Sequence, residues 1–374
     1  MDLLECRNEI DRIDNEILRL FEERMKVAES VAAYKIKTGK QVLDPEREKE
    51  KIRTLKAMAH GEFNALGVQE LFQQIMAISR KRQYQLLTEN KTEEAEFHEV
   101  GEIPLKNVRV VFQGVEGAYS YAAMRAYFDS EIKSCHVKAW RDAMEMVSEG
   151  LADYAVLPIE NSTAGIVTDI YDLLTEYRLY IVGEQIIPVK HVLLGLPGTE
   201  LSDIKTVFSH PQGLAQCKPF LEEHSDWRGI EAANTAMAAR KVAEEKDKTQ
   251  AAIASQEAGE VYGLSVLMEH VCRNEENATR FIIVGRDSVY MKNAKKISVC
   301  FELPHASGSL YHMLSHVIYN GLNMTRIESR PIAGKTWEYR FFVDFEGNLK
   351  DSAVENALRG LYAEANRMRV LGNY

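Results

Sequence analysis

Residues 2–37 read DLLECRNEIDRIDNEILRLFEERMKVAESVAAYKIK and contain neither Gly nor Pro. Apolar side chains recur through this stretch at helical spacing, which predicts a single helix. About 35 residues at 1.5 Å each make a helix of roughly 50 Å. Because most helical stability in proteins comes from packing, we expect this helix to lie against a partner. A second copy of the same chain is the partner that we favour.

Two shorter helices are predicted after it. Asp44 is typical of an N-cap and is followed by a proline, which predicts a helix over about 45–60. Residues 61–67 begin and end with glycine, which favours a turn, and a third helix is predicted over about 68–87. The prediction is an all-helical first domain over residues 1–90.

The middle of the chain is of another kind. Residues 88–107 carry six glutamates without an apolar period, which predicts a solvated linker with its boundaries at 91–106. Short apolar strands then alternate with helical patterns over 107–287, which is typical of a mainly parallel sheet, or of two. One of these strands is predicted at 137–140. We expect an α/β domain of two lobes with a cleft between them.

The last stretch, residues 295–374, reads strand, helix, strand, strand, helix, strand. This βαββαβ order is typical of a ferredoxin-like α+β domain. The chain is therefore predicted to be multidomain, with an all-α, a two-lobed α/β and an α+β domain in that order. Fold alone does not define a function, so the function has to be sought in individual residues.

The composition excludes several classes of protein. The 374 residues contain no apolar run long enough to span a membrane, and the charged first residues do not form a secretory signal. A net charge of −10 without a basic stripe argues against a nucleic-acid partner. Five scattered cysteines without a CxxC pair favour a reducing cytosol and argue against a disulfide framework or a zinc site. With no G-x-G or GK[ST] motif present, we expect a cytoplasmic protein that uses no metal and no cofactor.

Two cations of the long helix share one face. Arg24 and Lys35 are eleven residues apart, so they differ by only about 20° around the helix and lie about 16 Å apart along it. A solvated charged face is the simpler explanation of this spacing alone. The third helix favours a pocket, because its apolar stripe continues into Ser79 and Gln83, and a buried polar group without partners costs about 1–3 kcal/mol. Such an interior would suit a small anionic ligand.

These residues have the spacing of the all-helical chorismate mutases, and the first 90 or so residues resemble that family. The matching positions are Arg7, Glu23-Arg24, Lys35, Asp44, Arg47, Glu48, Ser79 and Gln83. The resemblance implies an interlocked dimer in which Arg7 comes from the partner chain. It also implies that the arginines and Ser79 hold the substrate carboxylates, that Lys35 and Gln83 act on the ether oxygen, and that Glu48 and the backbone near Asp44 take the hydroxyl.

Four further motifs lie at predicted strand ends, where open α/β sheets bind ligands. They are rich in small polar side chains and describe a cleft for an oxygenated substrate. Taken alone, the glycine-rich motif at 114–120 could be a phosphate loop. A structural role is the simpler one for His210, and Thr279 could simply cap or pair a strand. The motifs are GVEGAYS at 114–120, PIENSTAG at 158–165, SHPQ at 209–212 and NATRF at 277–281.

The last three motifs, with Gln216, resemble the prephenate dehydratase family over residues 108–286. That family has two α/β lobes like those of periplasmic binding proteins. The resemblance implies the loss of carbon dioxide and hydroxide from prephenate, with Thr279 as the favoured proton donor. Arg280 would either offset the charge of the substrate dianion or face away from the site, because neighbours on a strand point to opposite faces. The residues that would orient the substrate are Asn161, Ser162, Thr163 and Gln216.

The final domain resembles the ACT regulatory domains that follow such dehydratases. From pattern alone, its two distinctive segments are an ordinary helix start and an ordinary strand exit. The resemblance implies that they bind phenylalanine between two subunits, although Ser309 stands where the family often has Ala. The segments are Gly308-Ser309-Leu310 and Glu328-Ser329-Arg330-Pro331.

The whole chain thus resembles the bifunctional chorismate mutase–prephenate dehydratases, which implies a homodimer or higher oligomer that phenylalanine inhibits. A mutase fused to a prephenate dehydrogenase would need a nicotinamide fingerprint, and the sequence has none. A two-lobed domain that only senses its ligand would be favoured by the loss of Thr279 or of Asn161-Ser162, and these are present. Whether arogenate is also a substrate stays open.

Overall fold

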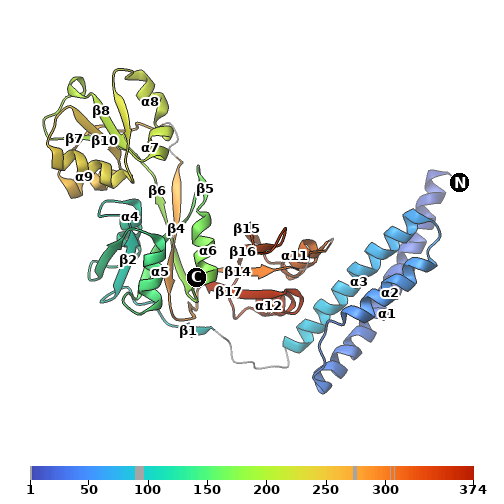
Figure 1. The fold of residues 1–374 in the computed structure, drawn as a ribbon. Coiled ribbons are helices and arrows are strands. Elements are labelled where there is room, and N and C mark those ends of the chain that lie inside the picture. The colour runs from blue at the N-terminus through green and yellow to red at the C-terminus, as the bar shows by residue number, and fades with distance from the viewer. Residues whose placement is uncertain (1, 89–96, 273–275, 304, 307) are drawn as a thin grey trace. The chain divides into compact units, whose positions relative to one another are not determined.

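The computed structural model describes residues 2–88, 97–272, 276–303, 305–306 and 308–374 (Figure 1). The chain forms two compact units. The first unit combines residues 1–95 with 295–370, and the second combines 96–294 with 371–374. The N-terminal helices and most of the C-terminal domain therefore belong to one unit. No helix of the described residues is long and apolar enough to cross a membrane.

Three helices begin the first unit: α1 (Leu3–Thr38), α2 (Pro45–Met58) and α3 (Glu62–Thr88). The Asp2 side chain accepts from the backbone N–H of Glu5, and the Glu5 carboxylate accepts from that of Asp2, so a capping box starts α1. Gly39 ends α1 in the left-handed conformation, with φ of 70°. The predicted long helix is confirmed.

The predicted turn over 61–67 is wrong. The chain is helical from Glu62 onward, and Gly67 lies inside α3. A single glycine costs a helix only about 1 kcal/mol relative to alanine, and α3 packs against both α1 and α2. The small cost of one glycine is therefore outweighed by the rest of this 27-residue helix, which packs against α1 and α2.

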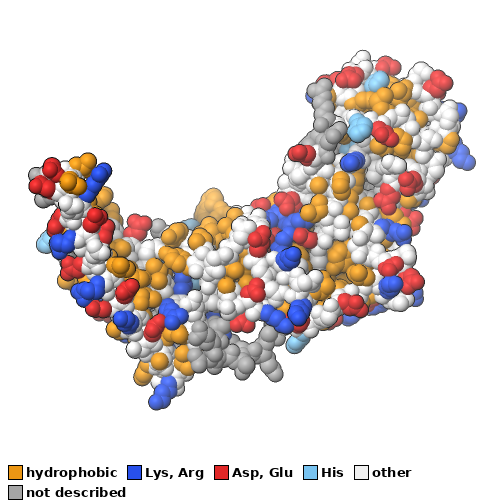
Figure 2. Space-filling view, turned by 180° about the vertical axis from the view of Figure 1, so that it is seen from behind, with side chains coloured by type: hydrophobic (Ala, Val, Ile, Leu, Met, Phe, Trp, Pro, Cys, Tyr) orange, Lys and Arg blue, Asp and Glu red, His pale blue; other side chains and the backbone are white. Residues whose placement is uncertain are grey.

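Most of the apolar surface of α1 is exposed in the single chain. Ala28 and Ala32 are its buried residues, whereas Ile10, Ile13 and Ile17 are 55%, 42% and 53% exposed. Figure 2 shows hydrophobic side chains on the surface of the three-helix part. An exposed apolar stripe of this length is typical of a surface that takes part in an interaction.

The C-terminal domain completes the first unit and has the predicted βαββαβ order. Its strands lie in the order β15, β16, β14, β17, and β16 is antiparallel to both β14 and β15. The elements are β14 (Lys296–Glu302), α11 (Ser309–Tyr319), β15 (Met324–Pro331), β16 (Tyr339–Glu346), α12 (Ser352–Glu364) and β17 (Arg367–Asn373). The last residues of β17 belong to the second unit, where Gly372 pairs with Ile181.

The second unit has two lobes, each built on a mixed sheet. The first sheet has the order β6 (Tyr180–Pro188), β12 (Ala278–Gly285), β4 (Tyr154–Asn161), β2 (Arg109–Gln113) and β3 (Lys133–Val137). Its β2–β3 and β2–β4 pairs are parallel, whereas β12 is antiparallel to β4 and β6. The short β5 (Gly165–Ile166) pairs with β4, and the helices of this lobe are α4 (Tyr119–Tyr127), α5 (Trp140–Ser148) and α6 (Thr168–Glu176).

The second sheet has the order β11 (Ser265–Met268), β7 (Val192–Gly195), β10 (Gln250–Ala254), β8 (Thr206–Ser209) and β9 (Arg228–Glu231). Its helices are α7 (Pro211–Gln216), α8 (Lys218–Glu223), α9 (Thr235–Glu245) and α10 (Gln256–Tyr262), with a 3₁₀ turn over Leu201–Asp203. The chain leaves the first lobe through β6 and returns through β12 (Figure 1). The two predicted lobes are confirmed, but the prediction of a mainly parallel sheet is wrong, because β7, β11 and β12 run antiparallel to their neighbours.

Two local predictions in the second unit are also wrong. The strand expected at 137–140 ends at Val137, and α5 begins at Trp140, because the Asp142 carboxylate accepts from the backbone N–H of Ala139 and caps the helix. Residues 97–106 are not a solvated linker, since Phe97 and Ile103 are buried and β1 (His98–Val100) pairs with β13 (Val289–Met291). The linker residues 91–96 lie outside the described residues.

The prediction about cysteines fails as well. Cys217 and Cys272 form a disulfide, with 4.5 Å between their Cα atoms. Fifty-five residues separate them in the sequence, so no local spacing could reveal that the end of α7 and the segment after β11 meet. Cys6, Cys135 and Cys300 are free thiols. The cytoplasmic location stays a prediction.

Candidate functional sites

In the three-helix domain, α1 and α3 bring three of the predicted site residues together. The Arg24 guanidinium donates to the hydroxyl of Ser79, and the Gln83 side-chain N–H group donates to the Ser79 carbonyl, 3.2 Å away. Ser79 and Gln83 are only 5% and 7% exposed. The apolar stripe of α3 therefore does end in a buried polar cluster, as its sequence predicts.

The start of α2 supplies the charged part of the same site. Burial lowers the pKa of Lys35, while the carboxylates of Asp44 and Glu48 oppose that shift and Arg47 adds to it. Burial also lowers the pKa of Arg24, again opposed by Glu48. The cations of α1 and the charged side chains at the start of α2 therefore lie close enough to shift one another's pKa.

Lys35 and Asp44 also hold the turn between α1 and α2. The Lys35 ammonium donates to the Val42 carbonyl at 2.6 Å, and the Asp44 carboxylate caps α2 by accepting from the backbone N–H of Arg47 at 3.2 Å. Both contacts fix the position at which α2 begins, next to the site.

Arg7 is not part of this cluster. It is exposed and precedes Arg24 by seventeen residues on the same helix, which is about 25 Å along the axis. Within one chain Arg7 cannot reach the other seven residues. A site that uses Arg7 requires a second copy of α1.

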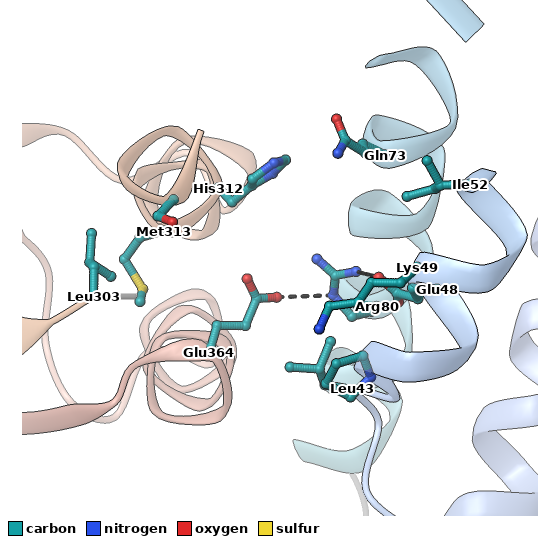
Figure 3. A pocket seen from close by; sticks show the side chains of 12 residues that line it. Leu43, Glu48, Lys49, Ile52, Gln73, Arg80, Leu303, His312, Met313 and Glu364 are labelled. Carbon is teal, nitrogen blue, oxygen red and sulfur yellow. Dashed lines mark hydrogen bonds and ion pairs between the residues drawn. The ribbon is translucent and has the colours of Figure 1, made fainter. Parts of the chain in front are cut away.

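Sequence reasoning missed a buried arginine beside the predicted site. Arg80 is 7% exposed and donates to Glu48 at 2.5 Å and to Glu364, at the end of α12, at 2.9 Å (Figure 3). His316 also lies 3.1 Å from the Glu364 carboxylate. The signal in the sequence is that Arg80 follows Met76 by four residues and so shares its buried face; its partner Glu364, 284 residues away, left no local sign.

Glu48, Arg80 and Glu364 line a pocket of about 270 Å³ within the first unit. Figure 3 shows Arg80 between the carboxylates of Glu48 and Glu364, with the His312 ring projecting from α11 toward the side of α3. Ser309, which was predicted to bind the effector, also lines this pocket. Glu48, which was predicted to bind chorismate, thus has the same arginine partner as Glu364 of the C-terminal domain.

In the second unit, the candidate dehydratase site lies where β4 and β12 pair. Thr279 is directly opposite Asn161 in this antiparallel ladder. The Asn161 side-chain amide donates to the Thr279 hydroxyl at 2.9 Å and to the Asn277 side-chain oxygen at 2.8 Å. Its own oxygen accepts from the backbone N–H groups of Thr163 and Ala164. The Asn161 amide is therefore fixed at both ends.

This arrangement decides how Thr279 can act. An amide nitrogen only donates, so the Thr279 oxygen is the acceptor in this bond, and the bond does not use the hydroxyl proton. Accepting a hydrogen bond polarises the O–H group and makes it a better donor. Thr279 can therefore offer its proton to a substrate oxygen.

Two other predicted residues, Ser162 and Gln216, contact Asn277 and Ala278, where β12 begins. Ser162 accepts from the backbone N–H of Ala278 at 3.0 Å, and Asn277 donates to the Gln216 side-chain oxygen at 3.3 Å. Thr163 is exposed at the turn after β4. Asn161, Ser162, Gln216 and Thr279 thus form one connected group.

Arg280 points elsewhere. Its guanidinium lies 3.3 Å from Glu160 and 3.2 Å from Glu184, and its side chain is only 11% exposed. Successive side chains of a strand face opposite sides of the sheet, which explains why Arg280 leaves the site that Thr279 enters. Its predicted contact with the substrate is therefore withdrawn.

The GVEGAYS motif packs the two lobes of the second unit against each other. Gly117 has a φ of 82°, and a Cβ atom there would lie 2.9 Å from the Cα atom of Ala258. Ser255 and Tyr262 donate to the carbonyls of Gly117 and Glu116. The structural role considered for His210 is confirmed, since its ring accepts from the backbone N–H of Gln212 and caps α7.

The two predicted effector segments lie on different elements. Gly308 precedes α11 with a φ of 79°, and Glu328–Pro331 ends β15, with β16 between β15 and β14. Within one chain, β16 therefore lies between β15, which carries Glu328–Pro331, and β14, the strand that precedes Gly308. A site that uses both segments is most simply completed by a second chain.

Comparisons with known proteins match the helical domain and the two-lobed domain to known enzyme families. The chorismate mutase type II family matches residues 6–84, and the prephenate dehydratase family matches residues 110–289. The bifunctional chorismate mutase/prephenate dehydratase of Escherichia coli K12 is 35% identical and covers 100% of this chain and 96% of its own length.

Solved structures match the larger part of the chain. A prephenate dehydratase from Arthrobacter aurescens in complex with L-Phe is 34% identical, with a TM-score of 0.66, over 71% of this chain and 89% of that one. A protein described as GqqA, a novel type of quorum quenching acylase, is 33% identical, with a TM-score of 0.65, over 71% and 96%. Agreement over the full length, mutase domain included, is with the bifunctional proteins. The chain therefore belongs to the family of bifunctional chorismate mutase/prephenate dehydratases.

Proposed function

We propose that the helical domain rearranges chorismate to prephenate, that the two-lobed domain converts prephenate to phenylpyruvate, and that L-phenylalanine inhibits the enzyme through the C-terminal domain. Residues 1–90, 107–287 and 295–374 are the proposed limits of the three parts, with the second extended back to Phe97, which is buried in its unit. The observation that carries this proposal is the Asn161–Thr279 pair on β4 and β12; the contact of Arg24 with Ser79 in the helical domain supports the mutase part.

The mutase reaction needs charge and shape rather than a nucleophile. The rearrangement is unimolecular, so the enzyme has to hold a dianion in a compact conformation and stabilise the negative charge that grows on the ether oxygen. Arg24 and Ser79 would hold a carboxylate, and Lys35 and Gln83 would donate to the ether oxygen. Glu48, which Arg80 holds in place, would accept from the substrate hydroxyl.

The second copy of the chain would supply Arg7 and cover α1. Arg47 is exposed at the first turn of α2. Its guanidinium would meet a substrate carboxylate on the side that the second chain covers. Replacing Ile13 with Glu on the exposed stripe should therefore give a monomer without mutase activity. Size-exclusion chromatography with light scattering checks the mass, and a dimer that keeps its activity would contradict this arrangement.

The dehydratase reaction breaks two bonds of prephenate. The ring carboxylate leaves as carbon dioxide, its electron pair enters the ring, and the ring C–O bond breaks as hydroxide takes up a proton and leaves as water. Aromatisation drives the step, so the enzyme mainly has to assist the departure of the hydroxyl. Thr279 would donate to that oxygen, while Asn161 and Gln216 orient the substrate around it.

Two features support phenylalanine as the regulator. The C-terminal domain has the βαββαβ order expected of an ACT domain, and the Arthrobacter aurescens protein, 34% identical, is a dehydratase in complex with L-Phe. Gly308–Leu310 and Glu328–Pro331 from two chains would form the site. Binding there would favour a less active arrangement of the dehydratase lobes.

One experiment tests the three parts together. Purified protein is mixed with chorismate and no cofactor, and chorismate, prephenate and phenylpyruvate are followed over time, with and without phenylalanine. The proposal expects phenylpyruvate to form and phenylalanine to suppress it. If prephenate accumulates instead, the mutase part stands and the dehydratase part is wrong. If phenylalanine has no effect, the regulatory part is wrong.

A further inference from the structure

A buried asparagine to which the mechanism gives no role lies where the two lobes of the second unit join. Asn277 is 4% exposed and directly precedes β12, through which the chain returns from the second lobe to the first. Its carbonyl accepts from the backbone N–H of Val189 at 2.7 Å, on the outgoing connection between β6 and β7. The backbone of Asn277 therefore ties the two connections between the lobes together and holds its side chain at their junction.

The Asn277 side chain joins one residue from each lobe. Its oxygen accepts from the Asn161 side-chain amide at 2.8 Å, and Asn161 ends β4 in the first lobe. Its NH₂ group donates to the Gln216 side-chain oxygen at 3.3 Å, and Gln216 ends α7 in the second lobe. The Ser162 hydroxyl also lies 3.4 Å from the Asn277 oxygen. One side chain therefore links predicted substrate residues of both lobes.

The backbone beside Asn161 decides how these amides are oriented. The Asn161 oxygen accepts from the backbone N–H groups of Thr163 and Ala164, at 3.1 and 2.9 Å, and a backbone N–H can only donate. The Asn161 NH₂ group therefore has to face the Asn277 oxygen. The Asn277 NH₂ group is then the end that faces Gln216, and Gln216 has to present its oxygen to it.

This order sets which end of the Gln216 amide can serve the substrate. The Gln216 oxygen faces Asn277, so the NH₂ group lies at the other end of the amide. The proposed substrate is a dianion with a ring hydroxyl, and its oxygens are acceptors that an NH₂ group can bind. A Gln216 amide turned by 180° would present its oxygen to a carboxylate and repel it. The bond from Asn277 favours the orientation that offers donors.

We propose that Asn277 is a positioning residue of the dehydratase, which fixes the Gln216 amide with its NH₂ group toward the substrate and in register with the Asn161–Thr279 pair. Asn277 acts through these residues and not on the reacting atoms, so its role rests on the proposed function. A buried polar network whose members are all satisfied is rigid and specifies one geometry.

An aspartate at position 277 separates this role from simple packing. Aspartate has nearly the size of asparagine and keeps an oxygen for Asn161, but an ionised carboxylate only accepts. It cannot donate to the Gln216 oxygen, and the Gln216 amide would turn to donate its own N–H group. Asn277→Asp therefore removes the proposed contribution of Asn277 with little change of shape.

A double-mutant cycle in the full-length protein, with prephenate as substrate, tests this role. A displacement of about 1 Å can cost on the order of 100-fold in rate, so Asn277→Asp should lower kcat/KM for prephenate about 10- to 100-fold. In a Gln216→Ala background the loss from the same substitution should be smaller by more than about 2-fold, because its target is absent. Losses that multiply to within about 2-fold, or an Asn277→Asp protein with wild-type kcat/KM, would overturn the role of Asn277.

Further variants separate positioning from charge and from folding. Asn277→Leu adds no charge and removes both contacts, so it should also lose at least about 10-fold; a fully active Leu variant would assign the loss in Asn277→Asp to its charge and overturn the proposal. Asn293→Leu replaces an exposed asparagine of the same unit and should keep wild-type prephenate turnover. All variants should keep chorismate mutase activity. If Asn277→Asp does not fold, as circular dichroism would show, Asn277→Leu takes its place in the cycle with the same criterion.

The outcomes also distinguish this proposal from the proposed function. If the wild-type protein does not convert prephenate, the proposed function fails, and the role of Asn277 fails with it. If the wild type is active and Gln216→Ala is as active, the Gln216 amide is not needed and Asn277 has nothing to position. If both single variants lose activity without coupling, only the role of Asn277 fails.

Discussion

At the scale of single residues, Thr279 is the group to which the proposed dehydratase mechanism gives the largest role. Its hydroxyl accepts from Asn161 and keeps its own proton for the substrate. General acid assistance contributes typically 10²- to 10⁴-fold, so Thr279→Val should lower prephenate turnover by about that factor. Chorismate should still be consumed, and prephenate should accumulate. Thr279→Ser restores the hydroxyl and is the matched control; equal activity of the Val and Ser variants would remove the hydroxyl from the mechanism.

His191 also predicts how stability depends on pH. Burial of its ring lowers its pKa from the ordinary value of 6.5 to about 4 in the folded protein. As the pH falls below 6.5 the unfolded chain takes up the proton first, so the stability present above pH 6.5 is progressively lost toward pH 4. One such proton changes the free energy of unfolding by at most about 1.4 kcal/mol per pH unit.

Chemical denaturation between pH 4 and 7 measures this loss. Fluorescence follows the second unit through Trp140 and Trp227, although Trp337 of the first unit adds to the signal. His191→Gln should flatten the pH dependence, whereas His98→Gln, at an exposed histidine of β1, should not. Parallel curves for the wild type and His191→Gln would show that the imidazole does not titrate in this range, and Tyr119 and His210, which face it, would have to be considered.

At the scale of elements, the local patterns predicted most helices and strands because hydrophobic periodicity and caps act over a few residues. The capping box at Asp2 and the proline after Asp44 mark the starts of α1 and α2 in sequence and structure alike. The errors arise where distant segments decide. Residues 98–100 become β1 only because β13 lies beside them, and Gly67 stays helical as one weak position in a helix that packs against α1 and α2.

The candidate sites also contain features that local sequence predicts and features that depend on distant residues. Ser79 and Gln83 were predictable, since polar residues interrupt an apolar stripe within one helix. The connections of Arg80 to Glu364 and of Cys217 to Cys272 were not, because their partners are 284 and 55 residues away. Of the two placements that strand alternation allowed for Arg280, its contacts with Glu160 and Glu184 fit the one that faces away from Thr279.

The contacts of α3 give a prediction of their own. Arg80 forms ion pairs with both Glu48 and Glu364 in a buried setting, where removing one partner of an ion pair costs about 3–5 kcal/mol. Arg80→Gln should therefore destabilise the first unit and raise the KM for chorismate, because Glu48 loses the partner that holds it. Arg82→Gln is the matched control on the same helix, since Arg82 and its partner Glu29 are 39% and 44% exposed and such surface pairs contribute about 0–1 kcal/mol.

Mutase kinetics and thermal melts of the two variants decide the matter. An Arg80→Gln protein with the stability and the chorismate KM of Arg82→Gln would mean that Glu48 needs no support from α3. A loss of stability with an unchanged KM would assign Arg80 to packing alone.

At the scale of the whole molecule, the mutase and dehydratase residues lie in different units, and no shared side chain joins their reactions in the described residues. Prephenate must therefore travel from one site to the other. Lys35→Ala should abolish the mutase and leave prephenate turnover intact, and Thr279→Val should do the reverse. Neither variant alone should form phenylpyruvate from chorismate at an appreciable rate.

Mixing the two variants then tests how prephenate moves. If it leaves one protein and enters another, an equal mixture of Lys35→Ala and Thr279→Val should convert chorismate to phenylpyruvate after a lag in which free prephenate builds up. The lag should shorten as the concentration of the Lys35→Ala protein rises, because that variant carries the active dehydratase. The double variant Lys35→Ala/Thr279→Val should stay inactive in the same assay. A mixture that consumes chorismate but forms no phenylpyruvate, although Lys35→Ala converts added prephenate, would show that prephenate made by the mutase does not reach other molecules.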